Sequence, residues 1–255
     1  MSDEWAALAP RFLAHYESLR GAVRTHVLHA HLRHHLPPPP APVIDIGGGA
    51  GHQAIPLLRD GFPVTIVDPS PAMLAEAAAA LALEDPEVAG RARLVQASGE
   101  DVASALPGEA FAGVLCHGVV MYVEPPEPLV AALCALAAPG GVVSIVAKNA
   151  ASLAVRPALQ GDWTTALEAF NGTRQVGGLD VDTRADTVED LEAMLRRHGV
   201  DPVAWYGVRL FTDGWRQDET PPHDPEAVFA VELEASRRDP YRQLSRLFHL
   251  VGVRA

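Results

Sequence analysis

Four glycines within a five-residue stretch mark the place in this sequence where a ligand could approach the backbone most closely. The apolar run Val43–Ile46 leads directly into them, and the amphipathic segment Ala54–Leu58 follows. A buried strand, a glycine-rich turn and a helix in this order suit a nucleotide-like ligand. A dinucleotide-binding loop has the pattern G-x-G-x-x-G, and its third glycine position is His52 here. The spacing is instead an acidic residue followed by G-x-G-x-G, made up of Asp45, Gly47, Gly48, Gly49 and Gly51.

A carboxylate and a surface for a purine ring are predicted downstream of this loop. Asp68 follows the apolar run Pro63–Val67, seventeen positions after the last glycine, where an acidic residue can accept hydrogen bonds from both ribose hydroxyls. Met73 lies in the next helical segment and can pack on adenine. A third apolar run, 92–97, ends in Ser98-Gly99-Glu100-Asp101, which can meet the edge of the ring. Each feature alone also fits a plain turn or a helix cap, but their order and spacing together predict an adenosine site.

Over these motifs the chain resembles the class I S-adenosylmethionine (SAM)-dependent methyltransferases. The resemblance runs from Asp45 through the glycines and Asp68 to the acidic turn at 98–101 and to Pro139-Gly140-Gly141. It implies an α/β fold with a seven-stranded, mostly parallel sheet of the Rossmann-like type. It also implies SAM as the cofactor and S-adenosylhomocysteine (SAH) as its product, and it is silent on the acceptor.

A closer resemblance, to the tRNA 5-carboxymethoxyuridine methyltransferases, is spread over nearly the full length. Seven segments outside the common motifs carry it: Tyr16–Arg24, Cys116–Val120, Asn149-Ala150, Gly207–Asp213, Glu232-Leu233-Glu234, Asp239-Pro240-Tyr241 and Arg246–His249. The resemblance implies methyl transfer to the carboxylate of a modified wobble uridine in tRNA, which gives a methyl ester. The chain departs from this family at 171–175, where Asn-Gly-Thr-Arg-Gln replaces a lysine-rich stretch.

The same resemblance implies which residues bind the cofactor. Arg24 would pair with the methionine carboxylate of SAM, the loop glycines would line its methionine and ribose, and Asp68 would hold the ribose. His117 would border the cofactor. The predicted cofactor-binding set is Arg24, Asp45, Gly47, Gly48, Gly49, Asp68, Met73, Gly99, Glu100 and His117.

A carboxylate acceptor places its own demand on the site. It is ionised at neutral pH and needs no general base, but it does need cationic side chains, preferably an arginine fork. Three residues are the candidates: Arg209 in a predicted sixth strand, Lys148 at the end of the fifth and Arg184 in a predicted lid. Lys148 is the single lysine among the 20 basic residues. For each candidate, a structural or surface ion pair is the alternative interpretation.

Two alternatives to a tRNA enzyme stay open. The net charge of −12 and the missing lysines favour a small-molecule carboxyl- or O-methyltransferase of specialised metabolism, because broad contact with RNA needs clustered Lys and Arg. The other alternative is a SAM-binding protein without catalysis, against which the intact glycine loop and Asp68 argue.

The elements that must position these residues are predicted to form one domain. Seven apolar runs predict strands, and helical segments between the first five predict a parallel sheet with right-handed crossovers. The predicted strands are 43–46, 63–68, 92–97, 111–116, 142–147, 205–211 and 247–254. Within a single methyltransferase domain, 1–255, we expect an N-terminal helical segment and proline linker (1–40), a SAM-binding core (41–148), a lid insertion (149–186) and a C-terminal part with substrate-facing elements (187–255).

Composition favours a cytoplasmic protein without a metal. No apolar run reaches the ~18 residues that span a bilayer, and Met1–Trp5 lacks the basic start of a signal peptide. Cys116 and Cys134 lie in apolar runs, so no disulfide framework is expected. Five histidines between His26 and His35 do not share one helical face, and a solvated helix is therefore expected there rather than a metal site.

Overall fold

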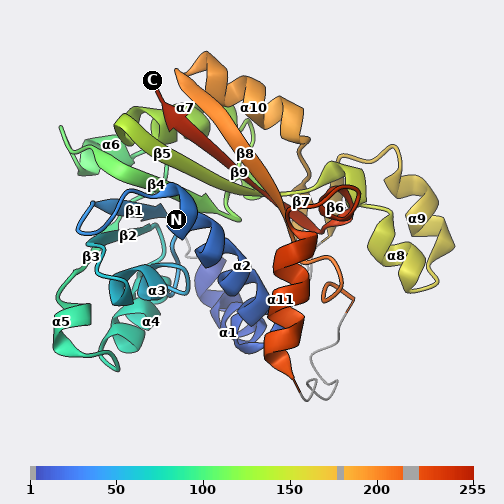
Figure 1. The fold of residues 1–255 in the computed structure, drawn as a ribbon, viewed down its shortest axis with the longest axis horizontal. Coiled ribbons are helices and arrows are strands. Elements are labelled where there is room, and N and C mark those ends of the chain that lie inside the picture. Colours follow the sequence, from blue (N-terminus) through green and yellow to red (C-terminus); the bar gives the residue numbers. More distant parts are fainter. Residues whose placement is uncertain (1–3, 177–180, 215–223) are drawn as a thin grey trace.

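Seven strands form one sheet in the computed structural model, which describes residues 4–176, 181–214 and 224–255 (Figure 1). The strand order is β3-β2-β1-β4-β5-β9-β8. β1 to β5 run parallel, whereas β9 is antiparallel to both of its neighbours, β5 and β8. The predicted fold class, an α/β protein with a seven-stranded and mostly parallel sheet, is confirmed. The strands of the sheet are β1 (Val43–Ile46), β2 (Val64–Asp68), β3 (Ala92–Gln96), β4 (Phe111–His117), β5 (Ala137–Lys148), β8 (Val200–Val208) and β9 (Leu247–Arg254).

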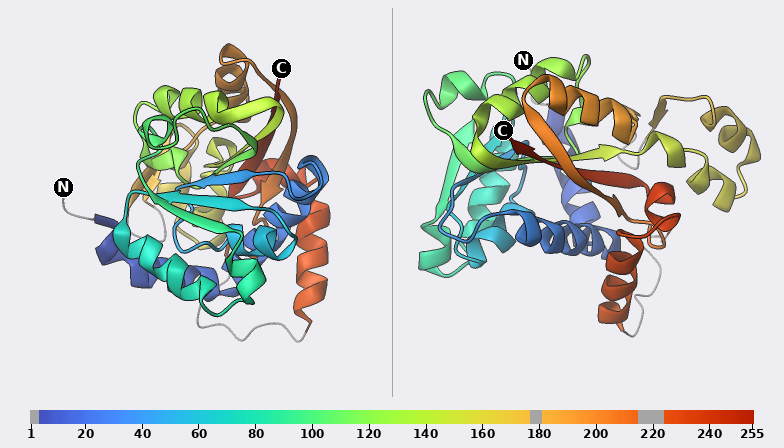
Figure 2. Two further views of the ribbon diagram at one scale, coloured as in Figure 1. Left: turned by 90° about the vertical axis from the view of Figure 1, so that its left-hand side faces the viewer. Right: turned by 45° about the horizontal axis from the view of Figure 1, so that its top comes forward.

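Helices cover both faces of this sheet (Figures 1 and 2). On one face, α6, α7 and α10 bury apolar side chains such as Leu129 and Leu191 against the strands. On the other face, α2 and α3 bury Leu32 and Leu57, and α11 packs against α2. The helices are α1 (Glu4–Glu17), α2 (Leu19–His35), α3 (Ala54–Arg59), α4 (Pro71–Leu81), α5 (Pro86–Ala89), α6 (Val102–Ala105), α7 (Glu127–Leu136), α8 (Val155–Leu159), α9 (Trp163–Ala169), α10 (Val188–Arg197) and α11 (Pro225–Ala235).

The N-terminal helical segment consists of two helices, α1 and α2. The Ser18 hydroxyl accepts a hydrogen bond from the Gly21 amide (3.3 Å) and so caps the start of α2. Any side chain at Gly21 would overlap the backbone of Tyr16. Glycine therefore allows the tight turn that brings α1 against both α2 and α4.

The segment 149–186 contains α8, α9 and a hairpin of β6 (Arg174–Val176) and β7 (Asp182–Arg184). In both figures α8 and α9 extend beyond the end of the sheet. The hairpin stays close to the sheet, because the amide of Asp186 donates to the carbonyl of Lys148 (2.9 Å) at the end of β5. That this segment acts as a lid stays a prediction.

Two strands differ from their predicted bounds by more than one residue. The apolar pattern places β8 at 205–211, but the strand runs from Val200 to Val208 and stops where Arg209 takes a left-handed conformation (φ 61°). β5 begins at Ala137 instead of 142, because the turn Pro139–Gly141 lies inside the strand as an irregularity in its pairing with β4.

The structure also differs from the expectation of a solvated helix at the histidines of α2, because not all of them are exposed. His31 is only 3% exposed, its ring stacks on Tyr206 with centroids 3.6 Å apart, and its Nε2 lies 2.8 Å from Ser236 Oγ. The described residues contain no group of three or more His, Cys, Asp or Glu placed to hold a metal ion. In the same part of the chain, no helix combines the length and hydropathy needed to cross a bilayer.

Candidate active site

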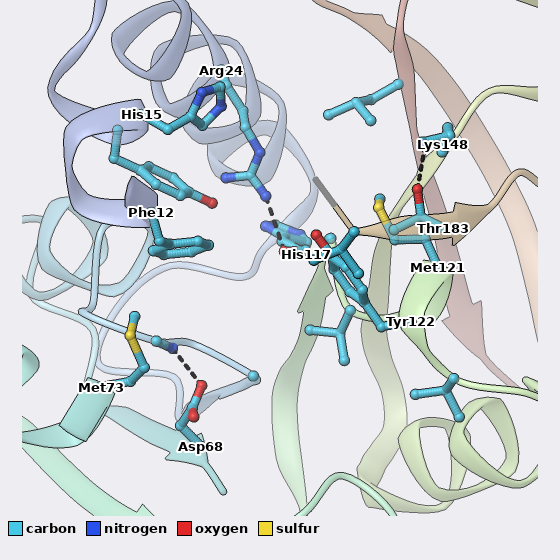
Figure 3. A pocket seen from close by; sticks show the side chains of 18 of the residues that line it. Phe12, His15, Arg24, Asp68, Met73, His117, Met121, Tyr122, Lys148 and Thr183 are labelled. Atoms are coloured by element: carbon cyan, nitrogen blue, oxygen red, sulfur yellow. Dashed lines mark hydrogen bonds between the residues drawn. The ribbon is translucent and has the colours of Figure 1, made fainter. Parts of the chain in front are cut away.

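A cavity of about 750 Å³ opens where β1, β2, β4 and β5 end, between the N-terminal helices and the hairpin β6–β7. Its size is that of a small-molecule site. Figure 3 shows side chains from α1 and α2 on one side of it, Asp68 and Met73 below, and Lys148 with Thr183 on the far side. The predicted residues that line it are Arg24, Gly47, Gly49, Asp68, Met73, Gly99, Glu100, His117, Lys148 and Arg209.

The glycine loop is shaped by close packing on both sides. Gly47 and Gly49 have positive φ angles of 69° and 54°, a backbone conformation that side chains disfavour. A Cβ at Gly47 would overlap Val119, and one at Gly49 would come within 3.1 Å of the Met73 side chain. Glycine is therefore needed here for the backbone itself to form a wall of the cavity.

Asp68 is held in place by this loop. Its Oδ2 accepts a hydrogen bond from the amide of Gly49 (3.0 Å), and its Oδ1 accepts one from the amide of Ser70 (2.9 Å). The residue is 7% exposed and lines the cavity at the end of β2. A carboxylate has about four lone-pair sites, so Asp68 can also accept hydrogen bonds from the hydroxyls of a ribose.

Asp45 and Gly48 lie beneath the loop and are not among the residues that line the cavity. A Cβ at Gly48 would meet Ile66 at 2.8 Å and the Asp45 carboxylate at 3.0 Å. Burial raises the pKa of Asp45 to about 7, against the opposing effect of Arg24. The structure thus places both residues where they support the loop from below.

Arg24 and His117 meet at one wall of the cavity (Figure 3). Arg24 Nη2 donates to the backbone carbonyl of His117 (3.0 Å), and the guanidinium lies 5.1 Å from the centre of the Tyr16 ring. The His117 ring is fixed from behind, with its Nε2 2.8 Å from Ser144 Oγ, which in turn lies 2.7 Å from His249 Nε2. Burial keeps the pKa of both histidines well below the ordinary value, so both rings are neutral.

Two of the three predicted acceptor-binding cations, Lys148 and Arg209, line the cavity. Lys148 is 3% exposed, and its Nζ donates to the Gln175 carbonyl (2.8 Å) and to the Thr183 hydroxyl. Arg209 is 7% exposed, and its Nη2 donates to Asp213 Oδ1 (2.8 Å). Both partners of Lys148 belong to the hairpin β6–β7, which therefore closes the cavity beside Lys148.

Arg184, the third candidate, is placed elsewhere. Its guanidinium donates to the carbonyls of Val123 (2.6 Å) and Val120 (3.1 Å) and forms an ion pair with Asp186 (2.9 Å). It is not among the residues that line the cavity. These contacts tie the hairpin to the segment after β4 and do not bring Arg184 together with Arg209 and Lys148.

The N-terminal helices contribute more to the cavity than the motifs indicate. Phe12, His15 and Tyr16 line it from α1, and Arg156 and Arg246 line it near Arg209. Tyr16 belongs to a segment that resembles the tRNA methyltransferases, and Arg246 belongs to another, so a signal existed for these two residues. Phe12, His15 and Arg156 lie outside every motif considered above.

Comparison with known proteins agrees with this arrangement. Residues 43–141 match the family model of a methyltransferase domain. Over 210 residues the chain is 28% identical to the tRNA 5-carboxymethoxyuridine methyltransferase of Escherichia coli (strain K12). The aligned region covers 82% of this chain and 78% of that protein.

Solved structures of methyltransferases share the fold. The CcbJ methyltransferase from Streptomyces caelestis superposes with a TM-score of 0.62 at 14% identity, over 91% of this chain and 90% of that chain. The glycopeptide N-methyltransferase MtfA in complex with SAM gives a TM-score of 0.58 at 16% identity, over 90% and 94%.

The match to the methyltransferase model extends from β1 into β5, the same strands whose ends line the cavity. At the end where β1 and β2 stop, the residues fit SAM: the loop leaves no room for side chains at Gly47 and Gly49, and Asp68 faces the same space. Fold, domain match and cofactor chemistry therefore agree: the chain has the class I methyltransferase fold, it contains a methyltransferase domain over residues 43–141, and its activity is SAM-dependent methyl transfer.

Proposed function

We propose that this methyltransferase acts in the cytoplasm on the carboxylate of 5-carboxymethoxyuridine at the wobble position of tRNA. The name of the Escherichia coli relative supports this nucleoside as the acceptor. The observation that supports a carboxylate as the acceptor is a group of four cationic side chains that line the cavity. This group, here called the cation cluster, consists of Lys148, Arg156, Arg209 and Arg246.

The cation cluster carries more positive charge than the described residues around it neutralise. Among those residues, Asp213 is the one carboxylate that forms an ion pair with a member of the cluster, namely Arg209. Burial, together with the neighbouring Arg209 and Arg156, lowers the pKa of Arg246 to about 10, against the effect of Asp213. Because buried charge without a partner is unfavourable, the cluster favours an anionic acceptor. The chain as a whole has a net charge of −12, so this local excess of positive charge sets the cavity apart and supports an anionic acceptor.

The two ends of the cavity would then have separate tasks. When bound, SAM supplies a methyl group activated by its positively charged sulfur. Arg24 would hold the methionine carboxylate, and Asp68 would hold the ribose. Arg209 and Lys148 would hold the acceptor carboxylate so that one of its oxygens takes the methyl group. Since this acceptor is already ionised, the residues contribute alignment and the exclusion of water rather than proton removal.

A small organic acid is the second candidate acceptor, and one observation favours it. Arg174 is the cation of the stretch 171–175, where the tRNA enzymes have lysines. Its guanidinium is engaged by Asp182 (2.6 Å) and Glu124 (3.3 Å), which reduces what it can contribute to phosphate binding. The cation cluster would hold the carboxylate of a small acid equally well.

The role of Arg209 is tested by substitution. Arg209→Ala should lower kcat/KM for the acceptor by ~10- to 1,000-fold and leave SAM affinity intact, because a charge-assisted bidentate pair contributes a few kcal/mol. Arg209→Lys should recover only part of the loss, since a point charge does not reproduce the fork. Steady-state kinetics with tRNA that carries 5-carboxymethoxyuridine gives the first quantity, and calorimetry with SAH gives the second. An unchanged kcat/KM in Arg209→Ala would contradict the assignment.

A further inference from the structure

We infer that His15 is a positioning residue for the acceptor, because its ring nitrogen holds the guanidinium of Arg209 in the orientation that receives the carboxylate. The inference rests on the proposed role of Arg209 and adds to it a residue from a different part of the chain. His15 lies in the last turn of α1, and Arg209 follows β8, 194 positions away in sequence.

The contact between the two residues fixes one side of the guanidinium. His15 Nε2 lies 3.0 Å from Arg209 Nη1, and Asp213 Oδ1 lies 2.8 Å from Arg209 Nη2. The two terminal nitrogens of Arg209 are therefore held by different elements. Each of these nitrogens carries two hydrogens, so each can still donate a hydrogen bond to one oxygen of a bound carboxylate. His15 and Arg209 both line the cavity, which places this fork at its surface.

The contact is a hydrogen bond only if His15 is neutral, because a protonated imidazole has no nitrogen that accepts. Burial, together with Arg209, Arg20 and Arg24, lowers the pKa of His15 to about 3, against the effect of Asp213. His15 is therefore neutral over the whole range in which the enzyme can be assayed. Because Arg209 always donates, Nε2 is the accepting nitrogen and the ring proton lies on Nδ1.

The backbone at Arg209 gives an independent reason to regard its side chain as positioned. Arg209 is the one residue other than glycine with a positive φ (61°) in the described part of the chain. This conformation is unfavourable for a residue with a side chain and persists where its surroundings fix it. The Arg209 carbonyl accepts a hydrogen bond from the Arg246 amide (2.9 Å), and the side chain has the contacts to His15 and Asp213. Together these contacts hold both ends of the residue.

The test compares two substitutions of His15 that differ in one property. Leucine fills similar space but cannot accept a hydrogen bond, whereas glutamine offers an amide oxygen at a similar reach. His15→Leu should raise KM for tRNA carrying 5-carboxymethoxyuridine by about 10-fold or more, the effect of losing one hydrogen bond to a charged group. His15→Gln should recover most of that loss. His34→Leu, the same change at an exposed histidine of α2, should leave KM unchanged.

Two further measurements separate positioning from a general effect on folding. The affinity for SAH should stay within about 2-fold of wild type in His15→Leu, because Arg209 is proposed to hold the acceptor and not the cofactor. The ratio of KM in His15→Leu to KM in wild type should be flat from about pH 5.5 to 8.5, since His15 does not titrate there. A ratio that changes with a midpoint near the ordinary histidine pKa would overturn the inference. So would equal losses in the leucine and glutamine variants together with weakened SAH binding.

The same experiment distinguishes failure of the inference from failure of the proposed function. If Arg209→Ala raises KM but His15→Leu does not, His15 has no positioning role and the acceptor site stands. If Arg209→Ala leaves kcat/KM unchanged and neither variant changes KM, the proposed function of Arg209 is wrong, and the inference about His15 falls with it.

Discussion

Replacing Arg24 by alanine should remove the contact to the methionine carboxylate of SAM while sparing the rest of the cofactor. The Arg24 side chain is buried in the wall of the cavity and already donates to the His117 carbonyl at 3.0 Å. Burial limits screening by salt, so a charge-assisted pair with a carboxylate should contribute roughly 1.5–3 kcal/mol. At 1.4 kcal/mol per tenfold change, the affinity for SAM and for SAH should fall by roughly 10- to 150-fold. Adenosine has no carboxylate, and its affinity should be unchanged.

Isothermal titration calorimetry with SAM, SAH and adenosine measures these three affinities directly. Arg24→Lys should lie between wild type and alanine, because it keeps the charge without the fork. Arg33→Ala is the matched control, since Arg33 lies on the same helix with a side chain that is 62% exposed, and it should bind all three ligands normally. If Arg24→Ala weakens adenosine as much as SAH, the cause is a loosened α2 and the assignment is refuted. An unchanged SAH affinity would refute it equally.

Two other residues give predictions of a different kind. Asp68→Ala should lower the affinity for SAM, SAH and adenosine alike, by roughly 10-fold or more, because all three contain the ribose whose hydroxyls would lose a charged acceptor. A loss of affinity confined to SAM and SAH in the same titrations would exclude the ribose role. Burial and the neighbouring Arg246 lower the pKa of Lys148 to about 8, so Lys148 is charged below that pH and neutral above it. KM for the acceptor should therefore rise as pH increases through about 8 and should lose this dependence in Lys148→Met, whereas a wild-type KM that is flat up to pH 9.5 would show that the charge is not used.

The glycine loop and Asp68 could be placed at the cavity from the sequence because their signals are local. Gly47 and Gly49 follow β1 directly, and Asp68 is the last residue of β2, so the motif and the strand that carries it occupy one short stretch. The last strand, Leu247–Arg254, matches its predicted bounds because a long apolar run has no competing interpretation. Asp45 and Gly48 belong to the same motif, but only the packing of the loop shows that they lie beneath it.

The acceptor end could not be predicted with the same success, because its contacts join distant segments. Arg184, Arg209 and Lys148 were equivalent as isolated cations in the sequence. Their difference lies in their partners, since Arg184 is engaged by two carbonyls and Asp186, whereas the other two line the cavity. The contact between Arg209 and His15 spans 194 positions, and no local pattern indicates it. The apolar pattern likewise does not predict the left-handed conformation of Arg209 that ends β8.

Methyl-labelled SAM gives a direct test of carboxyl methylation of a tRNA nucleoside. Purified protein is incubated with the labelled cofactor and tRNA that carries 5-carboxymethoxyuridine, and the product is treated with mild alkali before nucleoside mass spectrometry. We expect the label to enter the tRNA as the methyl ester of 5-carboxymethoxyuridine and to be released by alkali. A label on tRNA that survives alkali would contradict carboxyl methylation, and an alkali-labile label found only on small acids would contradict tRNA as the substrate.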